Sequence, residues 1–172
     1  MDIIRTNNPK VLEEIDHTRY VLHGSDRPLE VVEPKQAHGS EDDPLQNQSA
    51  VYGTLCVEIA AINAIIRPDP SEPGSTGAHW KLDVKSNLLC VWGTGLVFQN
   101  GFVHVLPIDT FKVHRVGTFC LSRCTVRTER IIEVEPVIFA RFKGIAMSQE
   151  AISALDKALK AAGYKTAIRE KT

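Results

Sequence analysis

Apolar residues recur at helical spacing in two parts of the chain. Between residues 55 and 66 nearly every position is apolar, and this pattern predicts a largely buried helix. Residues 147–165 carry a narrower apolar stripe, with Ser148 placed to cap the first turn and Gly163 to end the last one. An Asn-Pro pair, typical of a cap and first turn, predicts a further short helix over residues 8–16.

Most other apolar residues lie in short runs that are separated by turn signals and are typical of β-strands. The second half of the chain contains five of them: 88–92, 101–107, 110–116, 119–126 and 130–139. Two more, 18–22 and 50–54, flank a polar stretch from Pro28 to Ala50 that we expect to form a long exposed loop. With helices early and last and strands between them, we expect an α+β domain built around an antiparallel sheet.

Length and composition are those of one globular domain. The 172 residues, 43% apolar and 24% charged, predict a single domain over residues 1–172. No apolar run is long enough to span a membrane, and the amino terminus lacks the order of a secretory signal, so we expect a cytoplasmic protein without a membrane partner. Four cysteines in a chain of this size do not form a disulfide framework and are expected to be reduced.

Charge is distributed unevenly although the net charge is only −1. Acidic side chains predominate in residues 1–60 and basic side chains in residues 61–172. A basic cluster can attract phosphates or an acidic partner, but it also suits the solvated face of several strands. We favour the solvated face, because no aromatic residues alternate with these charges as on a nucleic-acid stacking platform.

Two short motifs lie on either side of the polar stretch from Pro28 to Ala50. The first is YVLHGS at residues 20–25, and the second is VYGT at residues 51–54, just before the predicted buried helix. In order and approximate separation they resemble the histidine-glycine and tyrosine motifs of the ADP-ribosyltransferases of the diphtheria-toxin and poly(ADP-ribose) polymerase type. The resemblance covers roughly residues 18–136 and implies a split antiparallel β-sheet core with flanking helices.

The resemblance also implies an activity and a set of site residues. Members of the family use NAD as a substrate, and a toxin-like mono-ADP-ribosyltransferase would transfer ADP-ribose to a protein or nucleic-acid acceptor. In this role the backbone of Gly24 would hold the nicotinamide amide and the ring of Tyr52 would stack on nicotinamide. His23 would bind a ribose, and Ser25 would lie close to the same wall. The loop from Pro28 to Ala50 would cover the dinucleotide.

A third element departs from the family pattern. Family members place a glutamate just before the strand that resembles residues 119–126, and in this chain that position is Phe119. Glu133 and Glu135 lie on one face of the next predicted strand and could approach the site from elsewhere. Two alternatives to transfer therefore stay open. One is a catalytically inactive module that binds NAD, ADP-ribose or a protein, and the other is an RNA-processing enzyme similar to the tRNA 2'-phosphotransferases.

Two further sets of residues suggest chemistry less strongly. Cys120 and Cys124, with His104 and His114 on preceding strands, offer four possible zinc ligands, but their spacing inside β runs does not suit a zinc knuckle, so we expect no metal. The two tryptophans, Trp80 and Trp92, are interpreted as core or loop anchors rather than base-stacking residues.

Overall fold

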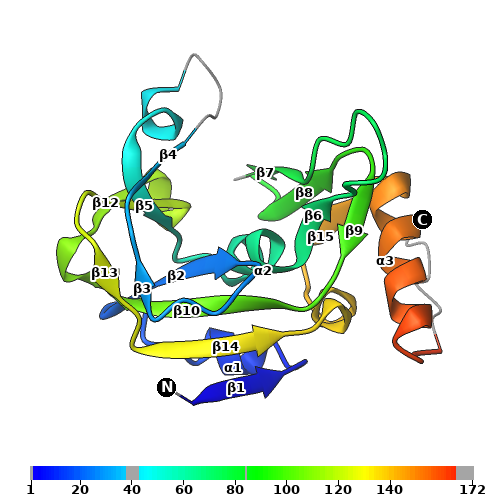
Figure 1. Ribbon diagram of the computed structural model, residues 1–172, viewed down its shortest axis with the longest axis horizontal. Coiled ribbons are helices and arrows are strands. Elements are labelled where there is room, and N and C mark those ends of the chain that lie inside the picture. Colours follow the sequence, from blue (N-terminus) through cyan, green and yellow to red (C-terminus); the bar gives the residue numbers. More distant parts are fainter. Residues whose placement is uncertain (1, 38–42, 84, 166–172) are drawn as a thin grey trace.

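The computed structural model describes residues 2–37, 43–83 and 85–165, and Figure 1 traces the chain. Within these residues the helices are α1 (Lys10–Glu13), α2 (Val57–Ile65) and α3 (Gln149–Ala161), with 3-10 turns η1 (Pro44–Gln46), η2 (Ile108–Thr110), η3 (Arg115–Gly117) and η4 (Pro136–Ala140). The strands are β1 (Ile3–Thr6), β2 (Tyr20–Ser25), β3 (Val31–Val32), β4 (Lys35–Gln36), β5 (Ser49–Gly53), β6 (Ile66–Pro68), β7 (His79–Asp83), β8 (Leu88–Trp92), β9 (Leu96–Phe98), β10 (Gly101–Pro107), β11 (Lys112–His114), β12 (Phe119–Ser122), β13 (Val126–Arg127), β14 (Arg130–Val134) and β15 (Ile145–Met147).

Two four-stranded sheets form the larger part of the fold. The first has the order β1-β14-β10-β2, in which β1 runs parallel to β14 and the other neighbours are antiparallel. The second, β11-β12-β5-β4, is antiparallel throughout. An isolated bridge between Leu22 of β2 and Thr54, directly after β5, ties one sheet to the other, and both backbone hydrogen bonds of this bridge are formed. Beyond the bridge the strands β2 and β5 diverge, which opens space between the sheets.

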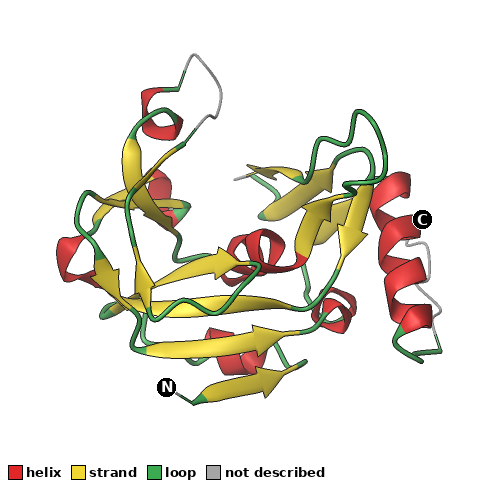
Figure 2. Cartoon of the chain, in the orientation of Figure 1, coloured by secondary structure: helices red, strands yellow, loops and turns green. Residues whose placement is uncertain are grey.

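Smaller sheets complete the molecule. The strands β15-β8-β7 form one of them, β6 pairs with β9, and β3 pairs with β13. Figure 1 shows β5 and β12 on one side and β7 and β8 on the other, with α2 and the end of β2 between them. Figure 2 shows how much of the chain is strand, with the longest helix, α3, along one flank.

Helix α2 is the centre of the core. Seven of its nine residues are buried, and it packs on both β2 and β10. The approach to β10 is so close that a Cβ atom built at Gly101 would lie 1.7 Å from the carbonyl oxygen of Ala64. Only glycine leaves room for a backbone at that distance. The helix is therefore held in a fixed position relative to the end of β2.

The observed elements confirm the α+β class and most of the predicted helices and strands. The helices over 8–16, 55–66 and 147–165 are present with shorter limits, and Ser148 caps α3 by accepting from the amide of Ala151 (3.3 Å). The expected long loop from Pro28 to Ala50 is instead partly ordered: it contains β3, β4 and η1, while residues 38–42 lie outside the described part. The run 130–139 ends as a strand at Val134, because Pro136 begins the turn η4.

The single-domain organisation and the ADP-ribosyltransferase arrangement of the strands stay predictions at this point. The structure shows a pair of sheets that meet at the Leu22–Thr54 bridge and part beyond it. The place where they part contains both sequence motifs.

Candidate functional site

A cleft of about 1220 Å³ lies where the two sheets part. Its floor is formed by the end of β2 and the first half of α2, one wall by the end of β5 and the start of β12, and the other wall by β7 and β8. In Figure 1, β5 and β7 lie on either side of α2. Ligand sites in proteins usually occupy about 300–1,000 Å³. The cleft is thus large enough for an extended ligand and part of a second reactant.

His23 and Tyr52 meet at the floor of this cleft. The Nδ1 atom of His23 donates to the backbone carbonyl oxygen of Tyr52 over 2.6 Å, and both residues line the cleft. A carbonyl can only accept, so Nδ1 carries the proton and Nε2 keeps a free lone pair. Burial lowers the pKa of His23. This hydrogen bond has the opposite effect and raises it, whereas the charge of Lys35 lowers it further. The imidazole is therefore neutral at pH 7, with one acceptor left for a ligand hydroxyl.

The ring of Tyr52 is fixed from its far end. Its hydroxyl donates to the carbonyl oxygen of Gln48 (3.0 Å) and accepts from the amide of the same residue (3.4 Å). The half-buried ring forms part of the cleft wall. An aromatic ring held at its hydroxyl end in this way offers a stacking surface that loses little entropy when a planar ligand binds.

Gly24 is a glycine because of helix α2. A Cβ atom built on it would lie 2.3 Å from the carbonyl oxygen of Ala60 and 2.6 Å from the amide nitrogen of Ala64. The backbone groups of Leu22 face Thr54, and in an extended strand the groups two residues on point to the same side. The N–H and C=O of Gly24 therefore point to the side on which β5 has diverged, and this residue lines the cleft.

Ser25, the next residue, does not share this position. It is not among the residues that line the cleft, and its hydroxyl contacts the carboxylate of Asp26 and the amide of Arg27, both at 3.4 Å. Of the four residues predicted for the site, the structure thus brings together His23, Gly24 and Tyr52, and places Ser25 just beyond the cleft.

Phe119 lies in the cleft at the position predicted for a family glutamate. Its ring contacts the ring of Trp80 on the opposite wall, with centroids 5.6 Å apart, and the guanidinium of Arg115 lies over it at 5.0 Å. Glu133 and Glu135 do not approach this place. Glu133 pairs with Arg5 and bonds Asn100, while Glu135 accepts from the hydroxyl of Tyr164 (2.9 Å), and neither lines the cleft.

A carboxylate does reach the cleft from another element. Glu58, in the first turn of α2, is the one acidic residue among the described residues that line it. The thiol of Cys56 donates to Glu58 Oε2 over 3.1 Å, and burial, above all, raises the pKa of that thiol to about 12. Cys56 is therefore a neutral hydrogen-bond donor that orients the carboxylate, not a nucleophile.

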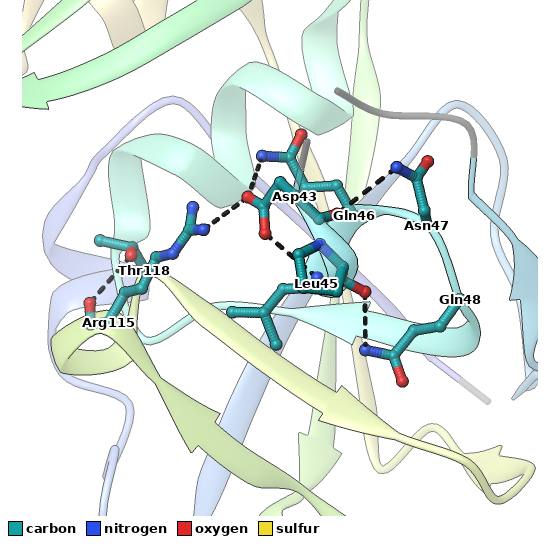
Figure 3. A network of polar contacts seen from close by, with 8 residues as sticks. Asp43, Leu45, Gln46, Asn47, Gln48, Arg115 and Thr118 are labelled. Carbon is teal, nitrogen blue, oxygen red and sulfur yellow. Dashed lines mark hydrogen bonds and ion pairs between the residues drawn. The ribbon is translucent and has the colours of Figure 1, made fainter. Parts of the chain in front are cut away.

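Three cations line the same cleft. Lys81 and Lys143 lie on the side of β7, and Arg115 lies on the side of β12. Arg115 has a left-handed backbone conformation (φ 48°), and its guanidinium forms an ion pair with Asp43, as Figure 3 shows. Asp43 also accepts from the amide of Leu45 (3.1 Å) and the side chain of Gln46 (2.7 Å), so this ion pair ties the turn η1 to the cleft wall.

Of the residues considered for a zinc site, His104 has a structural role. His104 is fully buried, its Nε2 accepts from the amide of Leu29 (2.9 Å) and its Nδ1 donates to the carbonyl oxygen of His23 (3.1 Å). Burial lowers the pKa of His104 to about 4, so it is a neutral structural residue beneath His23. Within the described ranges no group of three or more metal-ligating side chains is found.

The interpretation of the tryptophans as core or loop anchors is confirmed for Trp80, which packs against the main hydrophobic core, and not for Trp92, whose side chain is exposed. Trp80 is half-buried and lines the cleft, and Trp92 is 43% exposed and borders it. Two further cleft residues, Glu58 and Asn63, were not predicted from the sequence. A signal was present: they are the two polar residues of an otherwise apolar helix, and both line the cleft.

Comparison with protein-family models, with curated proteins and with solved structures finds no match to this chain. Among the described residues, no helix has both the length and the apolar character needed to cross a membrane.

Proposed function

We propose that this protein is an NAD-dependent mono-ADP-ribosyltransferase that modifies a macromolecular acceptor. One observation carries the proposal: His23 and Tyr52, 29 positions apart in the sequence, are joined by a hydrogen bond on the floor of one large cleft. Gly24 lies beside them, with its backbone groups directed to the side on which β5 has diverged. A backbone amide and carbonyl, a stacking ring and an imidazole acceptor match the amide, the aromatic ring and a ribose hydroxyl of the NAD nicotinamide riboside.

The charges of the cleft support the same ligand. NAD carries two negative phosphates and one positive pyridinium ring. Among the described residues, three cations line the cleft, Lys81, Lys143 and Arg115, the last of which is ion-paired with Asp43, and Glu58 is the one carboxylate. A cleft with low-dielectric walls focuses such charges on its contents, so the arrangement favours a ligand that is anionic along most of its length.

The chain can also assist cleavage of the bond between ribose and nicotinamide. No acid is needed, because the electron pair of that bond moves to the ring nitrogen and neutralises the pyridinium. The ribose carbon gains positive charge in the transition state, and a fixed carboxylate stabilises such charge. Glu58, held by Cys56, is the group that can supply it. The same carboxylate can then take the proton of the attacking hydroxyl or water.

The test measures NAD affinity and nicotinamide release separately. We expect Tyr52→Ala to lower the affinity for NAD about tenfold or more, since the stacking surface is lost. Glu58→Gln should leave NAD affinity within about twofold and lower nicotinamide release about 10²- to 10³-fold. Glu14→Gln, an exposed carboxylate outside the cleft, is the matched control and should change neither quantity. Equal NAD affinity in Tyr52→Ala and the parent would contradict the proposal.

A second function, a catalytically silent module that binds NAD or ADP-ribose, is favoured by Phe119. This ring occupies the position of the expected carboxylate and is packed between Arg115 and Trp80. Tight NAD binding by the parent protein without any nicotinamide release would establish the module and exclude the transferase.

The 2'-phosphotransferase alternative needs several arginines that converge on one pocket. Of the basic cluster in the second half of the chain, Arg115 is the one arginine among the described residues that line the cleft. No observation therefore favours this alternative over the first two.

A further inference from the structure

A shallow hollow of about 360 Å³ lies beside the cleft and shares two residues with it, His79 and Trp92. These residues are paired across β7 and β8, and their rings stack with centroids 6.0 Å apart and planes at 22°. The ring pair thus forms a ridge, with the cleft on one side and the hollow on the other.

The two rings of the ridge are more exposed to solvent than is usual for aromatic side chains that only stabilise a fold. Trp92 is 43% exposed and His79 is exposed as well. A tryptophan that only stabilised the fold would gain more by burying its ring, whereas exposed aromatic surface beside a cleft is typical of a surface that binds a partner. Because His79 and Trp92 lie between the hollow and the cleft that is proposed for NAD, the hollow suits the second reactant rather than NAD.

The charge of the hollow identifies the chemistry of its occupant. Among the described residues that line it, Glu150 is the one with a formal charge, and the others are Thr76, His79, Trp92, Gly93, Thr94 and Ser148. The carboxylate of Glu150 forms no hydrogen bond or ion pair with any residue that the structure describes. A free carboxylate beside an exposed indole ring attracts a cation and repels the phosphates of a nucleic acid.

We propose that the hollow binds an arginine side chain of a protein acceptor, with the guanidinium stacked on Trp92 and bonded to Glu150. The planar guanidinium suits both contacts, because it stacks on indole and donates in parallel to both oxygens of a carboxylate, whereas a lysine ammonium does neither as well. The arginine is an anchor beside the modified residue and takes no part in bond making. The acceptor role rests on the proposed function, but binding of the guanidinium does not depend on NAD.

Two tryptophans make the binding step directly observable. The experiment records the indole N–H signals of Trp80 and Trp92 in the NMR spectrum of the parent chain and assigns them by comparison with Trp92→Phe. We expect the blocked tripeptide Ala-Arg-Ala to shift the Trp92 signal with a dissociation constant in the millimolar range, as suits one cation–π contact and one charged hydrogen bond. Ala-Lys-Ala should bind at least about threefold more weakly, and Ala-Gln-Ala should cause no shift.

The carboxylate is tested with a matched pair of variants. Glu150→Gln should weaken Ala-Arg-Ala about fivefold or more, whereas Glu14→Gln should leave its affinity unchanged. No shift of Trp92 up to tens of millimolar peptide, an unchanged affinity in Glu150→Gln, or tighter binding of a trinucleotide than of Ala-Arg-Ala would each overturn the inference. A parent protein that binds the arginine peptide but not NAD would refute the proposed transferase and leave the guanidinium site standing.

Discussion

The contact between β2 and α2 at Gly24 gives the sharpest prediction about the fold. In Gly24→Ala the new Cβ atom would lie 2.3 Å from the carbonyl oxygen of Ala60, whereas real Cβ atoms essentially never come within 3.0 Å of a neighbour. The strand and the helix must therefore separate by about 0.7 Å or more, which loosens packing around a helix that is buried along most of its length.

The expected loss can be sized from this overpacking. Forcing extra volume into a well-packed core costs about 1–3 kcal/mol. In a chain of 172 residues this corresponds to a fall in the melting temperature of about 3–8 °C. Urea unfolding followed by circular dichroism, together with a thermal scan, measures both quantities. Ser25→Ala is the control on the same strand, and it should change the unfolding free energy by less than about 0.5 kcal/mol.

An unfolding free energy of Gly24→Ala equal to that of the parent would refute the described packing of α2 on β2. The same clash affects how a ligand-binding assay of Gly24→Ala must be interpreted. Because the clash is with helix backbone, a loss of NAD binding in Gly24→Ala would report a displaced strand as readily as a lost ligand contact. Tyr52→Ala is therefore the better test of the site.

Three further predictions concern residues around the cleft. Burial lowers the pKa of His104 from 6.5 to about 4 in the folded protein, so its contribution to stability is complete above pH 6.5 and is lost as the pH falls toward 4. Between pH 7 and pH 5 this residue should therefore lower the unfolding free energy of the parent by about 2 kcal/mol. In His104→Gln the unfolding free energy should fall by about 2 kcal/mol less over the same pH range. Tyr52→Phe loses the hydroxyl bond to Gln48 but keeps the ring, so it should lower the unfolding free energy by about 1 kcal/mol and leave NAD affinity within about twofold. Asp43→Ala removes the acceptor of the Leu45 amide and the partner of Arg115, so hydrogen exchange at the Leu45 amide should become at least about tenfold faster, and an unchanged rate would contradict the ordering role assigned to Asp43.

The sequence was sufficient where local pattern and burial agree. The apolar run at residues 55–66 could hardly be anything but a buried helix, and Ser148 and Gly163 carry standard cap chemistry, so α2 and α3 were predictable. Some strands carry no such local signal in the sequence. The strand β1 has three exposed residues of four and is held by parallel pairing with β14, a partner 128 positions away in register. Pairing at that distance is not encoded in any short window.

The residues of the candidate site likewise divide into those that the sequence could predict and those that it could not. His23, Gly24 and Tyr52 could be proposed because they form two short motifs in a known order. Trp80, Lys81 and Arg115 reach the cleft from segments with no recognisable motif, and their convergence depends on how β7 packs opposite β12. The reason for glycine at position 24 was also beyond sequence reasoning, since the ligand role and the packing role predict the same residue type and only the backbone of α2 distinguishes them.

Phe119, at the position where the resemblance predicts a glutamate, gives the cleft an apolar lining that would suit a catalytic role of Glu58 in the proposed function. The rings of Phe119 and Trp80, tilted at 32° to each other, bring apolar surface to the interior of the cleft, and they bridge its two walls. Apolar surface excludes water, and in the resulting low dielectric a single charge acts more strongly on a developing cation than it would in solvent. Under the proposed function, a glutamate at position 119 would supply its own charge but would attract water into the cleft. With phenylalanine there and the carboxylate held by Cys56 on α2, hydrolysis by water should be slow relative to attack by a docked acceptor. The ratio of transfer to hydrolysis in Phe119→Glu, measured against the parent with the same acceptor, is therefore expected to fall.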